Sequence, residues 1–381
     1  MRGFRKASTL AAALTVAACS PEIDRVYEVD TVRILAVQKT VDRGEGEPNG
    51  GSYARPGETV NFHMLWDAGS RNKAAGIPVQ RLWIKGCVNP KGDTFDGCAD
   101  FLLEAAQDPE QFVNEYVVPV EEEPRPSSKD TIAVTMPGKE ALRPAANEMP
   151  AYALYIVFFA ACAGEIGFTA EDVSIQDGRL PITCKRDGEL LGPDDFVVGY
   201  SSVYIFEDQK NENPLIDSLQ FWKDPTRAAP PQMKYFGLKR LEPPACAGVG
   251  CFDVIDPTTE EDINNLCTVG LCVEPCADDG DIDKCPGHQL VPWLTDGGWN
   301  AEKDTVSTRK LKEQLNVHYH ADRGKMRSDV RVVRDGSEQW NNGGFASNYY
   351  APAEPGPARL WVVLRDNRGG VDWMSLPLWI R

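Results

Sequence analysis

Two histidines separated by one residue are the first candidates for chemistry in this sequence. His318 and His320 alternate with the apolar residues Leu315, Val317 and Tyr319. Residues two apart on a β-strand point to the same face, so both imidazoles could reach one metal ion. The pattern predicts either a metal-assisted hydrolase that also uses nearby acidic residues or two solvent-facing histidines opposite a buried apolar face. We expect the second arrangement.

Recognisable catalytic signatures are absent from the rest of the sequence. The other two of the four histidines, His63 and His288, lie in separate segments and have no recognisable catalytic partner. The sequence contains no G-x-S-x-G, no H-E-x-x-H and no glycine-rich phosphate loop. We therefore expect a protein that is not an enzyme.

An acidic segment around a glycine is the second candidate for chemistry. Its carboxylates belong to Asp278, Asp279, Asp281 and Asp283. Alternating acids of this kind can supply several of the roughly six to eight oxygen ligands that Ca²⁺ prefers. The segment resembles the acidic repeats of thrombospondin-type calcium modules, but it occurs once and has Gln289 where an EF-hand has glutamate. The hypotheses are a bound Ca²⁺ cofactor and a solvated acidic loop.

The cysteines predict disulfide bonds. Eleven are present, so an even number remains once Cys19 is set aside. Even sets in each half favour bonds closed within each half, with the local pairs Cys87–Cys98 and Cys162–Cys184 in the first. Spacing does not choose among the connectivities of the six in the second half, which are Cys246, Cys251, Cys267, Cys272, Cys276 and Cys285. Zinc is the competing hypothesis, because three of these six are closely spaced.

The N-terminus is organised like a secretion signal. Three basic residues precede an apolar stretch, Ala7–Ala18, which is too short for a bilayer span of about 20 residues. Val16-Ala17-Ala18-Cys19 resembles the bacterial lipobox, which implies that residues 1–18 are a lipoprotein signal peptide and that Cys19 is acylated. Two or more acyl chains anchor a protein stably, whereas one binds only marginally. An ordinary signal peptide with an incidental cysteine is the alternative.

The lipobox resemblance also implies a location. Ser20 stands where lipoproteins retained in the inner membrane tend to have Asp, so we expect a lipid anchor in the outer membrane of the cell envelope. Loss of the signal peptide removes three basic residues and moves the net charge from −17 to −20. This acidity argues against nucleic acid as a partner and against attraction to anionic lipid. The expected partners are the membrane, through the lipid, and an envelope protein or a glycan.

The elements that would position these residues are mainly strands. Glu58–Trp66 alternates apolar and polar residues, as a half-buried strand does, and Tyr152–Cys162 is apolar on both faces, as a central strand is. A helix is expected near Asp100–Asn114, with Asp108 as N-cap and Pro109 as first residue.

Short strands and glycine or proline turns favour an all-β fold of two β-sandwiches. The polar segment Asn211–Pro214 divides the mature chain into a first sandwich over residues 31–210 and a second over 211–381, with a tether at 19–30. Residues 224–300 are rich in proline, cysteine and acid and show little periodicity. We expect a disulfide-rich irregular insertion there, helical only near Thr258–Leu266.

Several segments resemble known modules. Arg33–Val37 and Ala54–Val60 look like the opening of an immunoglobulin-like (Ig-like) or PKD-like module, and Arg359–Trp373 resembles its closing strands. Phe158–Gly164 and Asp194–Tyr200 are similar to uncharacterised lipoproteins of myxobacteria-type Gram-negative bacteria. The resemblance covers most of the chain outside residues 224–300. It implies Ig-like sandwiches but no activity, because that family has no catalytic residues to transfer.

The expected function is therefore a lipid-anchored, non-enzymatic binding or structural module of the cell envelope. One alternative is a calcium-stabilised adhesion or glycan-binding surface protein, and the second is the metal-assisted hydrolase. Tryptophans beside loops could form a sugar-binding platform, namely Trp293, Trp299, Trp340 and Trp373. Those within expected strands are assigned to the core, namely Trp66, Trp83, Trp361 and Trp379.

Overall fold

The structure is a computed structural model, and part of the chain is described in it. The described residues are 27–41, 43, 51–89, 95–120, 130–144, 150–169, 181–209, 211–223, 235–239, 259–277, 282–294, 313–334 and 344–381.

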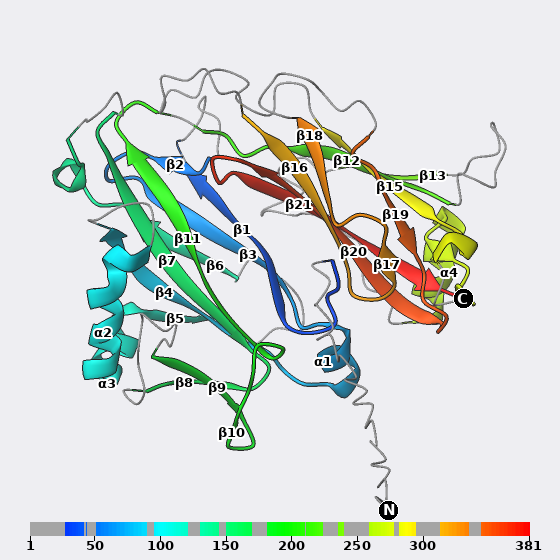
Figure 1. Cartoon of the computed structure of the whole chain (residues 1–381), viewed down its shortest axis with the longest axis horizontal. Helices are drawn as coiled ribbons and strands as arrows, with labels where there is room; N and C mark the ends of the chain where they lie inside the picture. Colours follow the sequence, from blue (N-terminus) through cyan, green and yellow to red (C-terminus); the bar gives the residue numbers. More distant parts are fainter. Residues whose placement is uncertain are drawn as a thin grey trace, which may run out of the picture.

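The first half of the chain forms two facing sheets (Figure 1). One sheet has the order β1-β3-β6, with β1 at Arg33–Val41, β3 at Thr59–Asp67 and β6 at Thr131–Thr135. The other has the order β2-β11-β7-β4-β5, at Tyr53–Ala54, Phe196–Phe206, Tyr152–Cys162, Gln80–Asn89 and Val117–Val120. Apolar side chains of both sheets, including the fully buried Phe62 and Trp83, form one core between them.

Strand β7 is buried on both faces, as its apolar sequence predicts. Val157 and Phe159 point into the core between the sheets. Ile156 and Phe158 point the other way, into a second core that the helices α2 (Ala99–Gln107) and α3 (Pro109–Tyr116) help to form.

The single helix expected near residues 100–114 is two helices. Asp108 interrupts it with non-helical backbone (φ −139°, ψ 81°), and its side chain accepts a hydrogen bond from the Gln111 N–H at 3.0 Å. Pro109 is then the first residue of α3, where its missing N–H has no cost. The predicted cap is correct, but it begins a new helix. The smaller elements of this half are α1 (Ser70–Ala75), β8 (Glu165–Phe168), β9 (Ile182–Arg186) and β10 (Glu189–Leu190).

The second half also forms two facing sheets around one core. The sheet β13-β12-β15-β19-β17 comprises Tyr235–Lys239, Ile216–Trp222, His288–Leu294, Ser347–Tyr350 and Lys325–Met326. The sheet β14-β21-β20-β16-β18 comprises Cys272–Val273, Val371–Ile380, Gly356–Asp366, Leu315–Ala321 and Val330–Arg334. Phe221, Tyr319 and Tyr349 are fully buried between them. The all-β prediction is confirmed, and the arrangement is compatible with Ig-like modules.

The expected insertion at residues 224–300 is only partly irregular. It supplies β15, which lies between β12 and β19 and is therefore part of the second sandwich. Pro292 makes this strand hard to recognise in the sequence, because proline has no N–H to donate. It is tolerated here because β19 pairs with β15 only as far as Leu290, so among the described residues no strand on the β19 side would accept a hydrogen bond from residue 292. The same region contains the helix α4 (Glu260–Val269), which Thr259 and Asp262 begin with a reciprocal capping box.

Disulfide bonds tie elements within each half. The described residues contain Cys87–Cys98 and Cys162–Cys184 in the first half, and Cys267–Cys272 and Cys276–Cys285 in the second. Among the described residues, no helix is long and apolar enough to cross a membrane.

Candidate functional site

The two sandwiches meet along a seam. Strand β1 is an edge strand that pairs only with β3 in its own sheet, and its other side contacts β21 of the second sandwich (Figure 1). A buried apolar cluster joins the two halves there, and we call this contact the seam. Its members are Val29, Leu35, Ala36, Leu65, Trp361, Val363, Val371 and Trp373.

A β-bulge shapes the side of the seam that belongs to β1. Ile34 pairs with Trp66 and Ala36 pairs with Leu65, so Leu35 is an extra residue in the strand. A bulge interrupts the alternation of side chains and bends the strand. Leu35 and Ala36 consequently both join the seam cluster, and the Leu35 carbonyl accepts a hydrogen bond from the Arg365 guanidinium across the seam.

The segment before β1 is also part of the seam. The Val29 N–H donates to the Ala321 carbonyl, and the Ala321 N–H donates to the Tyr27 carbonyl, both at 2.9 Å. Tyr27 is buried against the core of the second sandwich, and Val29 is buried in the seam. The last four residues of the expected tether, 27–30, therefore belong to the folded body.

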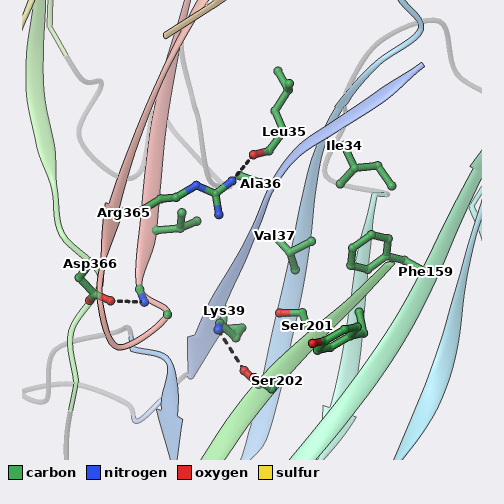
Figure 2. A pocket seen from close by; sticks show the side chains of 14 residues that line it. Ile34, Leu35, Ala36, Val37, Lys39, Phe159, Ser201, Ser202, Arg365 and Asp366 are labelled. Carbon is green, nitrogen blue, oxygen red and sulfur yellow. Dashed lines mark hydrogen bonds between the residues drawn. The ribbon is translucent and has the colours of Figure 1, made fainter. Parts of the chain in front are cut away.

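A pocket of about 360 Å³ opens at the seam, and residues of both sandwiches line it (Figure 2). Ile34, Val37 and Phe159 give it an apolar wall. Lys39 from β1 and Arg365 from β20 bring positive charge to it. A pocket with apolar walls and a few polar groups is the usual form of a small-molecule site.

Among the basic side chains that line the pocket, Lys39 has the most strongly shifted pKa. The residue is 5% exposed, and its Nζ donates to the Ser202 carbonyl at 3.0 Å. Burial lowers the pKa of Lys39 to about 8, although the nearby Asp366 carboxylate opposes part of that shift. Near neutral pH this amine is mostly charged, and small changes around it would change its protonation.

Asp366 holds the β20–β21 turn against β1. Its Oδ1 accepts from the Gly370 N–H at 2.6 Å and from the Arg368 N–H at 2.8 Å, and its Oδ2 accepts from Asn211 Nδ2 at 3.1 Å. Gly369 has a φ of 88°, and a Cβ there would lie 3.0 Å from Lys39 Nζ. The turn therefore packs closely against Lys39 at a position that only glycine fits, and it directly follows Arg365 in the chain.

Glu313 lies fully buried beside this turn. Burial first, and then the neighbouring Asp366 carboxylate, raise the pKa of Glu313 to about 9. Glu313 is therefore protonated and uncharged at neutral pH.

The predicted histidine pair faces the seam side of its sheet. His318 pairs with Val363 and His320 pairs with Trp361 on the neighbouring strand β20. Because directly paired side chains point to the same face of a sheet, both histidines lie on the face that Val363 and Trp361 turn towards the seam. His320 is 6% exposed and His318 is half-buried, so the expectation that both face solvent is wrong. Burial lowers the pKa of His318. The described residues contain no group of three or more side chains placed to hold a metal.

The remaining site residues predicted from the sequence are exposed, disulfide-bonded or outside the described part of the chain. Asp283 is exposed and its Oδ1 lies 3.2 Å from Arg327 Nη1. The zinc hypothesis concerned the closely spaced Cys267, Cys272 and Cys276, and it is wrong because all three form disulfide bonds. Cys267 bonds to Cys272, and Cys276 bonds to Cys285. Several of the residues lie outside the described part of the chain, namely Cys19, Cys246, Cys251, Asp278, Asp279 and Asp281.

Of the four tryptophans that could form a sugar-binding platform, two lie in the described residues, and one of these is buried. Trp373 is 6% exposed and belongs to the seam, because it lies inside β21 and not beside a loop. Trp293 is 53% exposed on β15. Trp299 and Trp340 lie outside the described residues.

Comparison with known proteins does not name a family. No family model and no curated protein matches the sequence. Among solved structures 13 chains match. One is a glycosyl hydrolase family 2 member from Bacteroides cellulosilyticus, which is 8% identical, with a TM-score of 0.15 over 92% of this chain and 29% of that one. This chain thus spans less than a third of that protein's length, and a likeness of this degree supports no conclusion about function.

Proposed function

We propose that the protein is a non-enzymatic binding module of the cell envelope, anchored to the outer membrane by lipid on Cys19, with the seam pocket as its recognition site. The observation that carries this proposal is the pocket itself, since β1 and β11 of one sandwich and the β20–β21 turn of the other line it together. Sites of this kind form preferentially where two domains meet.

The docking of residues 27–30 in the seam limits how far the body could lie from a lipid anchor. If Cys19 carries the lipid, only residues 19–26 separate the membrane from the body. Eight residues span at most about 28 Å when fully extended. The described body, from Tyr27 on, would then be held near the membrane surface, where it would meet ligands of the envelope.

The test is metabolic labelling with a palmitate analogue, followed by membrane fractionation. The wild-type chain is expected to incorporate the label and to sediment with membranes. Cys19→Ser is expected to lose both properties while its thermal melt stays unchanged, because the described packing begins at Tyr27. A wild-type chain that is secreted without label would refute the anchor.

A further inference from the structure

We propose that the seam pocket binds a small organic carboxylate, with its charged end between Lys39 and Arg365 and its apolar body against Ile34, Val37 and Phe159. The inference deepens the binding function proposed above and rests on it. It specifies the chemical class of the ligand.

The first argument is that the hydrogen bonds of the two cations at this pocket go to backbone carbonyls and not to a carboxylate. Lys39 Nζ donates to the Ser202 carbonyl, and Arg365 Nη2 donates to the Leu35 carbonyl. Within the described residues, neither side chain forms an ion pair with a carboxylate. Burying a charge is costly unless it is paired, so Lys39 in particular is placed where an anion would relieve an existing cost.

The second argument concerns the one acid in the lining. Asp366 accepts hydrogen bonds from the Arg368 and Gly370 N–H groups and from Asn211 Nδ2, which hold it in the turn. Two cations and one carboxylate leave the lining with net positive charge. The chain as a whole carries a net charge of −17, so this positive lining is an exception within an acidic protein. Such a contrast favours a small anion that can enter between the sandwiches.

The third argument distinguishes an organic acid from an inorganic anion. A pocket of about 360 Å³ is larger than a bare phosphate needs, and much of its wall is aliphatic or aromatic. Figure 2 shows Val37 and Phe159 beside the polar groups of Lys39 and Ser201. A ligand that fills this space needs an apolar part, and the planar guanidinium of Arg365 suits a carboxylate.

The experiment measures binding to the full chain, purified from whichever fraction contains it. The probes are acetate, benzoate and octanoate, each paired with its neutral amide, and inorganic phosphate, all titrated by calorimetry at pH 7. We expect benzoate or octanoate to bind and the matching amide to bind at least about 30-fold more weakly, as the loss of a buried charge contact implies. Affinity for the acid should fall as the pH rises above 8, because Lys39 then loses its proton.

Two variants locate the binding. Lys39→Met keeps the length of the side chain but removes its charge, and it should reduce the preference for acid over amide to the part that Arg365 supplies. Ser201→Leu fills the pocket from β11 and should block both. Lys85→Met is the matched control, since Lys85 is exposed on β4 and does not line the pocket. Melting curves and circular dichroism establish that each variant is folded.

The outcomes separate this inference from the anchored function. No binding by any acid, equal binding of acid and amide, phosphate binding as tightly as benzoate, or unchanged binding in both folded pocket variants would each overturn the carboxylate inference. The labelling of Cys19 would still stand in all of these cases. If the label is absent but benzoate binds as expected, the anchor fails and the ligand class holds.

Discussion

Glu313 is a single residue whose burial ties stability to pH. Its pKa rises from 4.5 to about 9 in the folded chain, so the folded state holds a proton that the unfolded state releases. This contribution to stability is fully present below pH 4.5 and is lost progressively as the pH rises to about 9. Glu313→Gln is always neutral and should remove the loss. We expect the variant to be more stable than wild type by about 1–3 kcal/mol at pH 8.5.

Urea unfolding of both chains at pH 5 and pH 8.5 checks this prediction. The two proteins should have similar free energies of unfolding at pH 5, where Glu313 is protonated in the folded state. A variant that is less stable than wild type at pH 8.5 would show that Glu313 is ionised in the fold.

His63 gives the opposite dependence on pH. Its Nε2 lies 3.0 Å from Thr40 Oγ1 and its Nδ1 lies 2.9 Å from Thr131 Oγ1, so it connects β1, β3 and β6. Burial lowers its pKa from 6.5 to about 4. The unfolded chain binds more protons between these values, so stability falls as the pH drops from 6.5 towards 4.

The variant His63→Gln keeps polar contacts but cannot titrate. Its stability should change less than that of wild type between pH 7 and pH 4.5, by about 1–2 kcal/mol. Denaturant melts at the two pH values measure the difference. Identical losses in both proteins would assign acid sensitivity to other groups.

At the scale of elements, strands with clear alternation are predictable and irregularities are not. Glu58–Trp66 and Tyr152–Cys162 become β3 and β7 because their apolar periods match the faces they bury. The bulge at Leu35 leaves no such mark, since R-I-L-A-V looks like an ordinary strand whether or not one residue is extra. The Leu35 carbonyl of the bulge accepts a hydrogen bond from Arg365, a tertiary contact that local sequence does not encode.

The break between α2 and α3 supports an element-scale prediction. The Asp108 carboxylate caps α3 through the Gln111 N–H, and both helices cover the outer face of β7. Asp108→Ala should destabilise the protein by about 1 kcal/mol, the usual cost of a lost N-cap. Asp108→Ser should retain most of the stability, and thermal melts compare the three. Equal losses in both variants would show that the carboxylate acts by its charge and not as a cap.

At the scale of the whole molecule, the candidate site could not be predicted because it forms only when distant segments meet. Lys39 lies in the apolar strand R-I-L-A-V-Q-K-T-V, and a lysine there looks like the polar member of an edge strand. Its burial depends on the turn at Gly369, more than three hundred residues later. The histidine pair was visible in the sequence, but the sequence did not reveal that its face abuts the other sandwich.

One lysine offers a test of whether the two sandwiches fold as one unit. Lys73 of α1 lies 2.8 Å from Asp67 in the first sandwich and 3.0 Å from Asp322 in the second, and it lies over the Trp361 ring. Both carboxylates are largely buried, with side chains 7% and 9% exposed. Burial raises the pKa of Asp322, and Lys73 partly offsets this.

Removing this lysine would leave two nearby buried carboxylates without their shared cation. Lys73→Met should therefore destabilise the chain by about 2 kcal/mol or more. Lys139→Met is the matched control, because Lys139 and its partner Glu207 are 75% and 46% exposed and such surface pairs contribute little to stability. Calorimetry should give one transition for wild type and a lower, still single, transition for Lys73→Met if the seam couples both sandwiches. Two separate transitions in the wild type would show that the seam is too weak to join them, and the pocket would then lack a rigid frame.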